Sequence, residues 1–284
     1  MTILVTGATG HLGRLIIEAL LRGGTPAADI VAAGRSVEKL DDLADRGVRV
    51  VRIDFADPAS LTAAFDGADA LMLVSGSEVG QRAAQHANAI DAARKAGVSR
   101  IVYTSAPGAT TSALVLAPEH KATEEYLQAS GVPFTVLRNN WYHENYEQSV
   151  QQAAATGVLA SSVGGGLIAS AARADYADAA AAVLVGDGHD GRTYELAGDE
   201  AWSQEEFAAA IAEASGRPVV YTALSPEEHL AMLTSAGLDE GTAGFVVALD
   251  GNARDGLLAG GSGELSALIG RPTTPLRDWL ATQF

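Results

Sequence analysis

The chain has 284 residues and a formal net charge of −16, with 19 basic and 35 acidic side chains. A chain this acidic is not expected to bind nucleic acid or an anionic membrane surface, because both attract basic faces. Its 48% of hydrophobic residues is typical of a globular protein, and the lack of cysteine excludes disulfides, thiolate nucleophiles and cysteine metal sites.

The first half of the chain alternates short apolar runs with longer helical patterns. Runs rich in β-branched residues predict strands at 3–6, 30–33, 48–55, 70–75, 101–105 and 134–138. The intervening periodicity predicts helices at 12–22, 36–44, 58–65, 79–96 and 118–129. Strands that alternate with crossover helices predict an α/β fold with a doubly wound parallel sheet of the Rossmann type.

The second half is less regular and carries most of the charge. We expect helices at 173–185, at 203–215 and from Ser225, a strand at 193–197 on the sheet edge, and a mobile glycine-rich loop at 251–263. Residues 1–142 are close to neutral at −2, whereas residues 143–284 carry −14. We predict a nucleotide-binding domain at 1–142, its sheet completed by about 166–198, and a smaller, mostly helical substrate subdomain at 143–165 and 199–284.

A glycine motif follows the first predicted strand and opens the first helix. Gly7 permits a tight turn, Gly10 lets the backbone approach a pyrophosphate, and Gly13 lets helix and sheet pack closely. The helix N-terminus then offers unpaired N–H groups to the anion. The stretch therefore predicts a dinucleotide phosphate site, whose further members are Ala8, Thr9, His11 and Leu12.

The end of the second strand indicates which dinucleotide binds. An acidic residue there would bind the ribose of NAD, but the sequence has Arg35, which can pair with a 2′-phosphate. We therefore expect NADP(H), the alternative being that Arg35 is a solvated surface residue. Asp54 ends the third strand beside the expected adenine, or caps the helix at Pro58. Three residues that end the fourth strand are expected beside the nicotinamide ribose: Leu73, Val74 and Ser75.

The sequence resembles the NmrA-like branch of the atypical short-chain dehydrogenase/reductase family, and within it the bacterial NAD(P)H:quinone oxidoreductase 2 group. The glycine motif marks only the superfamily, whereas the stretches at 137–146 and 173–176 are more specific. The resemblance covers essentially the whole chain. The matching stretches are 5–13, 77–82, 103–105, 117–120, 137–146, 170–176, 194–198 and 269–273.

The resemblance implies hydride transfer from NADPH to a small-molecule quinone without flavin. It also implies cofactor contacts at Gly7–Leu12, Arg35, Leu73–Ser75, Asn139–Tyr142 and Arg173. For Arg173 an ion pair with a nearby aspartate is the alternative. We expect a cytoplasmic protein, because no apolar run reaches membrane length and no signal peptide precedes the first strand. We expect a monomer or a homodimer.

The sequence departs from conventional short-chain dehydrogenases at the catalytic pair. Those enzymes use Tyr-x-x-x-Lys, but the residue four positions before Lys121 is Ala117. A quinone tolerates the loss of the tyrosine, because its reduction gives a weakly basic hydroquinone anion that needs little acid help. His120 and Lys121 are candidates to bind the ribose or a quinone oxygen, the alternative being ordinary first-turn helix residues.

An asparagine and aromatic cluster follows the sixth strand at the expected crevice. Asn139 and Asn140 can orient nicotinamide or quinone oxygens, and Trp141 and Tyr142 can stack on the substrate or pack a domain junction. The family usually carries glycine at the place of Asn140, which is expected to alter the pocket. The catalytic candidates are His120, Lys121, Asn139 and Tyr142.

The sequence is compatible with two other functions. The missing tyrosine is compatible with a redox sensor that binds NADP(H) without turnover. A sister family with much of the same pattern reduces triphenylmethane dyes, so another conjugated electrophile is a third possibility. No metal site is expected, because the six histidines show no metal-ligand spacing.

Overall fold

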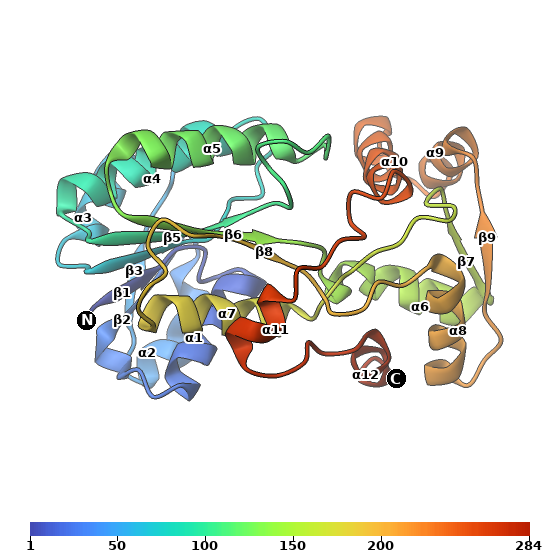
Figure 1. Cartoon of the computed structure of the whole chain (residues 1–284), viewed down its shortest axis with the longest axis horizontal. Coiled ribbons are helices and arrows are strands. Elements are labelled where there is room, and N and C mark those ends of the chain that lie inside the picture. Colours follow the sequence, from blue (N-terminus) through green and yellow to red (C-terminus); the bar gives the residue numbers. More distant parts are fainter. The chain divides into compact units, whose positions relative to one another are not determined.

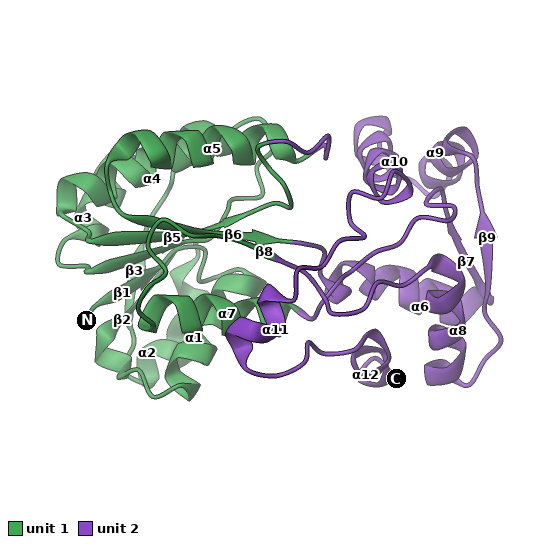
Figure 2. Cartoon of the chain, viewed as in Figure 1, with its two compact units in different colours: residues 1–110, 116–139, 173–195 green, residues 111–115, 140–172, 196–284 purple.

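The computed structural model describes all 284 residues, which fall into two compact units (Figure 2). Unit 1 comprises residues 1–110, 116–139 and 173–195, and unit 2 comprises residues 111–115, 140–172 and 196–284. The chain therefore builds each unit from three separate segments. The domain boundaries proposed from the sequence remain a prediction.

Unit 1 is built on a seven-stranded sheet of order β3-β2-β1-β4-β5-β6-β8 (Figure 1). The pairings from β3 through β6 are parallel, so the predicted doubly wound sheet is confirmed. The order reverses direction at β1, and the crevice at such a point is where ligands bind in these folds. The strands are β1 Ile3–Val5, β2 Ile30–Gly34, β3 Arg49–Arg52, β4 Ala70–Leu73, β5 Arg100–Ser105, β6 Phe134–Asn139 and β8 Thr193–Leu196.

Helices cover both faces of this sheet. Figure 1 shows α3, α4 and α5 over one face and α1, α2 and α7 over the other. Strands buried on both faces need continuous apolar runs, as β1, β2 and β4 have. The helices are α1 His11–Arg22, α2 Asp41–Asp45, α3 Pro58–Phe65, α4 Arg82–Ala96, α5 Ala117–Ser130 and α7 Arg173–Val185, with short 3-10 helices η1 Ala27–Asp29 and η2 Val37–Leu40.

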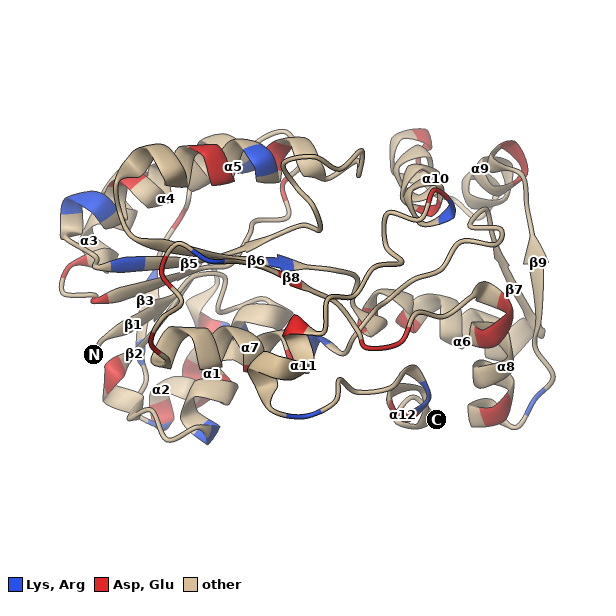
Figure 3. Cartoon of the chain, viewed as in Figure 1, with Lys and Arg blue, Asp and Glu red and all other residues tan.

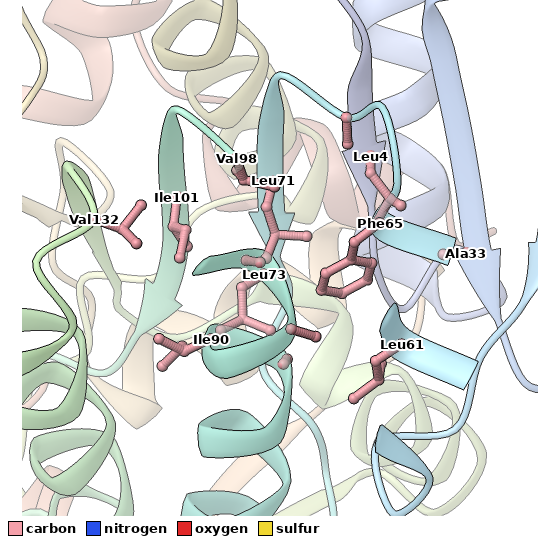
Figure 4. Packing of buried hydrophobic residues seen from close by; sticks show 14 of the residues in the cluster. Leu4, Ala33, Leu61, Phe65, Leu71, Leu73, Ile90, Val98, Ile101 and Val132 are labelled. Carbon is pink, nitrogen blue, oxygen red and sulfur yellow. The ribbon is translucent and has the colours of Figure 1, made fainter. Parts of the chain in front are cut away.

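The core of unit 1 lies between the sheet and the helices α3 and α4 (Figure 4). Phe65 and Leu61 of α3 point at the strands, and both side chains are fully buried. Burial of each such side chain contributes about 1.5–3 kcal/mol. The same buried cluster includes Leu4, Leu71, Leu73 and Ile101 from the strands and Ile90 from α4.

An ion-pair network centred on the mostly buried Arg138 connects α5, β6 and β8 at the edge of the sheet. Arg138 on β6 donates from Nη2 to Glu124 Oε2 on α5 at 2.6 Å, and from Nη1 to Glu195 Oε1 on β8 at 2.8 Å. Ser105 donates to Glu124 as well, at 2.6 Å. The strand predicted at 193–197 therefore joins the sheet edge, as expected.

Unit 2 is mostly helical but also contains a small sheet that the sequence did not predict. Strands β7 and β9 pair in parallel, with Val158 opposite Val220. The strands are β7 Val158–Ser161 and β9 Val220–Ala223, and the helices are η3 His143–Tyr146, α6 Glu147–Thr156, α8 Gln204–Ser215, α9 Pro226–Ser235, α10 Glu240–Arg254, α11 Glu264–Ile269 and α12 Leu276–Ala281.

Two sequence expectations for helices are corrected. The helix predicted from residue 79 begins only at Arg82, because Gly80 has a φ of +86° that a helix does not accept. The loop predicted at 251–263 is wrong in its first turn, since Gly251 is buried inside α10. A side-chain cap at Asp239 starts that helix, and burial of its face overrides the low helix propensity of glycine.

Candidate functional site

A cavity of about 380 Å³ opens in unit 1 at the carboxyl ends of strands β1, β2 and β4. It lies where the strand order reverses, which is the expected position for a ligand. The predicted site residues that line it are Gly7, Thr9, Gly10, His11, Leu12, Gly13, Arg35, Asp54, Val74, Ser75 and Arg173. The structure therefore brings together residues from five separate parts of the sequence.

The turn from β1 into α1 is folded so closely that it requires glycine at two positions, Gly7 and Gly13. Gly7 has a φ of +62°, and Gly10 N–H donates to its carbonyl at 2.9 Å. A Cβ on Gly13 would lie 2.3 Å from the Gly7 carbonyl oxygen. Residues 10–13 at the start of α1 line the cavity, and the first turn of this helix holds no acid and no side-chain cap bond, so the positive end of the helix borders the cavity.

Hydroxyl groups lock the strand ends that form the cavity wall. Thr6 Oγ1 donates to the Met72 carbonyl at 3.1 Å and accepts from Val74 N–H at 3.0 Å. Ser75 N–H donates to Thr104 Oγ1 at 2.8 Å. These bonds tie the ends of β1, β4 and β5 together at the cavity wall formed by Val74 and Ser75.

Arg35 lies at the cavity and contacts an acid that the sequence did not identify. Its Nη1 is 2.6 Å from Glu78 Oε1, and Gln85 Nε2 donates to Glu78 Oε2 at 2.8 Å. The hydrogen bond from Gln85 and the Arg35 guanidinium hold the pKa of Glu78 below its usual range. In the sequence, the stretch 77–82 indicates only a resemblance to the family, and no spacing rule links Glu78 to Arg35.

Asp54 lines the cavity but does not cap helix α3. Its carboxylate accepts from Ala56 N–H at 2.9 Å, while Asp57 is the N-cap and accepts from Ala59 N–H at 3.0 Å. The alternative role of Asp54 as a helix cap is therefore wrong. Ile53 and Phe55 on either side add apolar surface to the cavity, which suits the flat face of a base.

His120, on helix α5 where the catalytic tyrosine is missing, lies deep in unit 1. His120 is 5% exposed, and its Nδ1 is 2.7 Å from the Tyr103 hydroxyl. Burial lowers the pKa of His120 to about 3 and raises the pKa of Tyr103. At neutral pH His120 is therefore an uncharged imidazole, and it does not line the cavity.

Lys121 points away from this core. It is about half exposed, and its Nζ is 4.0 Å from Glu125 Oε1 one helical turn along α5. Ala8 and Leu73 are also absent from the cavity lining, because both are fully buried behind it.

The asparagine and aromatic cluster is divided between the two units. Asn139 ends β6 in unit 1 and is 6% exposed, whereas Asn140, Trp141 and Tyr142 belong to unit 2. Asn140 Nδ2 donates to the Leu258 carbonyl at 3.0 Å, and the Trp141 carbonyl accepts from Ala171 N–H at 3.1 Å. Tyr142 bridges to Ala171. These contacts hold residues 140–142 in place within unit 2.

The cavity combines three features: the backbone amide turn before α1, the Arg35 guanidinium, and an apolar slot formed by Ile53 and Phe55. The amide turn and helix end suit a pyrophosphate, Arg35 suits a further phosphate, and the slot suits a planar ring. The absence of a side chain at Gly13 lets α1 pack closely against the Gly7 carbonyl, and Gly10 leaves the backbone of the turn open to a pyrophosphate. The structure holds no cluster of three or more histidine or carboxylate side chains that could bind a metal ion.

The profile of a family described as NAD(P)H-binding matches residues 7–186. The chain belongs to this NmrA-like, NAD(P)H-binding family. It is 48% identical to Quinone oxidoreductase 2 of Escherichia coli strain K12, over 99% of this chain and 98% of that protein. The resemblance stated from the sequence is therefore confirmed.

Solved structures resemble the whole chain. NADPH-dependent quinone oxidoreductase from Escherichia coli, complexed with NADPH, matches with a TM-score of 0.96 and 47% identity over 99% of both chains. Triphenylmethane reductase from Citrobacter sp., complexed with NADP(H), matches with a TM-score of 0.95 and 37% identity over 100% of both chains. The fold predicted from the sequence is confirmed over its full length.

Proposed function

We propose that this protein is an NADPH-dependent reductase that transfers a hydride to a quinone. The observation that carries the proposal is the cavity built from the glycine turn and Arg35, in a chain so similar along its length to Quinone oxidoreductase 2. A cofactor with a 2′-phosphate fits this cavity, because an arginine stands where NAD-type sites have an acid.

Bound NADPH would supply the hydride from C4 of its nicotinamide. The backbone N–H groups of the turn and the positive end of α1 would bind the pyrophosphate, and Arg35 would hold the 2′-phosphate. Val74, Ser75 and Arg173 would position the other half of the cofactor. The work of the protein is then mainly to hold the reacting atoms in a near-attack geometry.

The product sets a low demand for proton donation. Hydride addition to a quinone gives a hydroquinone anion, which takes one proton to become the hydroquinone and is only weakly basic. A buried, neutral His120 is compatible with a reaction that needs no strong acid. The catalytic assignments of His120, Lys121, Asn139 and Tyr142 remain predictions, as does the absence of flavin.

A direct assay tests the proposal. Purified protein free of flavin should oxidise NADPH in the presence of 1,4-benzoquinone, and should use NADH less well. Arg35→Ala should weaken NADPH binding about 10- to 100-fold, as expected for a lost charged hydrogen bond, and leave NADH nearly unchanged. NADPH binding without turnover of any acceptor would indicate a redox sensor and would refute the enzyme proposal.

Reduction of another conjugated electrophile is the second candidate. The similarity to triphenylmethane reductase over the whole chain favours it. Decolourisation of a triphenylmethane dye in the same assay, at a higher kcat/KM than any quinone, would support this candidate over the first. Turnover that is unaffected by Asn139→Ala and Tyr142→Phe would remove both residues from the substrate site.

We also propose where the protein acts and in which oligomeric state. None of the helices in the structure meets the requirements for a membrane span. We place the protein in the cytoplasm because the proposed reaction consumes NADPH, which is an intracellular reductant. A monomer or a homodimer is expected, and light scattering of the purified chain distinguishes the two.

A further inference from the structure

The arginine proposed to bind the 2′-phosphate is already occupied by a carboxylate. Arg35 Nη1 and Glu78 Oε1 are 2.6 Å apart, and both residues line the same cavity. The Arg35 side chain is 67% exposed and that of Glu78 is 35% exposed, so a ligand can reach both. A phosphate that binds Arg35 therefore meets Glu78 at the same guanidinium.

Glu78 does not depend on Arg35 alone for its position. Gln85, which is 8% exposed on α4, donates from Nε2 to the second carboxylate oxygen of Glu78 at 2.8 Å. The Glu78 carbonyl also accepts from Arg82 N–H at 3.1 Å, in the turn that opens α4. The carboxylate is thus held from the protein side while its other oxygen faces Arg35.

The segment that carries Glu78 is itself fixed to the body of unit 1. Arg82 is 5% exposed, and it donates from Nε to the Gly76 carbonyl at 2.7 Å and from Nη1 to Glu119 Oε2 at 2.9 Å. Gly80 N–H donates to the other oxygen of Glu119 at 2.9 Å. These bonds restrict the retreat of Glu78 from the cavity when an anion arrives.

The electrostatic consequence is a competition for one guanidinium. A phosphate monoester carries a charge of about −1.5 to −2 at neutral pH, and Glu78 is ionised there because its pKa is lowered. NADPH must displace the carboxylate or bind beside a like charge, and both alternatives weaken binding. NADH lacks the 2′-phosphate and so does not meet this cost.

We propose that Glu78 is a specificity-determining residue that occupies Arg35 in the free protein and thereby weakens NADPH binding relative to NADH. This inference rests on the proposed function, in which Arg35 holds the 2′-phosphate. It follows that Glu78 keeps the preference for NADPH moderate and speeds the release of NADP⁺.

The test is a comparison of cofactor binding to the whole protein and to Glu78→Gln. The amide keeps the size of the side chain and an oxygen that accepts from Gln85, but it removes the charge. Isothermal titration calorimetry should show NADPH, NADP⁺ and 2′,5′-ADP binding about 3- to 10-fold more tightly, while NADH changes by less than about 2-fold. Steady-state kinetics should show a lower KM for NADPH.

Two further variants isolate the contact. Glu38→Gln makes the same charge change close by, at an exposed glutamate that lies near Arg52 and does not line the cavity. It should leave NADPH binding nearly unchanged. In the double variant Arg35→Ala/Glu78→Gln, the gain from Glu78→Gln should disappear, because the shared guanidinium is gone.

The outcomes separate the two proposals. If the protein prefers NADPH but Glu78→Gln does not tighten its binding, or tightens NADH equally, the role of Glu78 is refuted and the proposed function stands. An equal gain in Glu38→Gln would assign the effect to net charge and also refute that role. If the unaltered protein binds neither cofactor, both the proposed function and the role of Glu78 are refuted.

Discussion

His86 and His120 are buried imidazoles that the folded protein keeps uncharged. Burial, reinforced by the nearby Arg82 guanidinium, lowers the pKa of each to about 3. The hydrogen bonds agree with a neutral ring at His86, where Nε2 accepts from Gly76 N–H at 3.1 Å and Nδ1 lies 3.0 Å from Thr123 Oγ1. A charged ring would lose the first of these bonds.

This burial makes the stability of the protein pH-dependent. In the unfolded chain both rings titrate near pH 6.5, so between pH 6.5 and about 3 the unfolded state binds protons that the folded state does not. The free energy of unfolding should therefore be highest above pH 6.5 and fall as the solution is acidified. Urea unfolding between pH 7 and 5 measures it, and each histidine adds up to about 1.4 kcal/mol per pH unit.

Single variants assign this slope to the buried rings. His120→Gln should lower the pH dependence of the free energy of unfolding by the equivalent of about one proton between pH 6 and 5. A slope that stays the same in His120→Gln would mean that the ring is protonated in the folded state.

Among single residues, the sequence predicts those whose roles depend on their neighbours along the chain. Gly7, Gly13 and Arg35 follow strand ends at fixed offsets, and all three line the cavity. The partner of Arg35 could not be predicted, because Glu78 is 43 residues away and comes near it only when β1 pairs with β2 on one side and β4 on the other. The contact between His120 and Tyr103 was missed for the same reason.

Among the elements, helix α1 makes an unusually close approach to the turn before it. A Cβ at Gly13 would lie 2.3 Å from the Gly7 carbonyl, whereas a Cβ at Gly244 in α10 would meet nothing within 4 Å. Both glycines are inside helices, so the same substitution tests two opposite effects.

Gly13→Ala should destabilise the protein by about 1–3 kcal/mol, because the methyl group forces α1 away from the turn. Gly244→Ala should stabilise it by about 0.5–1 kcal/mol, because alanine lowers the entropy cost of the helix and finds open space. Denaturant unfolding of the two variants measures both changes. An unaltered stability in Gly13→Ala would mean that the turn relaxes without cost.

The elements that the sequence missed depend on distant pairing. Strands β7 and β9 are short, mostly exposed or half-buried, and 58 residues separate the end of one from the start of the other. Neither has the continuous apolar run that identifies β1 or β4. By contrast, the capping boxes at Ser203 and Ser225 are local signals, and α8 and α9 begin directly after them.

Across the whole molecule, charge and function are distributed unequally. Acidic positions occur on α8, α9 and α10 of unit 2 (Figure 3). Residues 1–142, which contain most of the cavity lining, carry only −2 of the total −16. A neutral quinone is not repelled by the remaining acidic surface, whereas an anionic substrate would be.

The three tryptophans, Trp141, Trp202 and Trp279, all lie in unit 2, whereas the proposed cofactor cavity lies in unit 1. Tryptophan fluorescence therefore reports the unfolding of one unit while the ligand binds the other. Strand β8 crosses the boundary between the units along the chain, because its residues up to Glu195 belong to unit 1 and Leu196 belongs to unit 2. Within unit 2, the Leu196 carbonyl accepts from Asn140 N–H at 2.8 Å.

Because strand β8 continues along the chain from unit 1 into unit 2, we expect the units to unfold together. NADP⁺ at about 100 times its dissociation constant should raise the free energy of unfolding by about 2.7 kcal/mol. The shift should be equal by tryptophan fluorescence and by far-UV circular dichroism, and smaller with the same concentration of NAD⁺. A fluorescence midpoint that does not move, with a second transition in circular dichroism, would show instead that each unit unfolds independently.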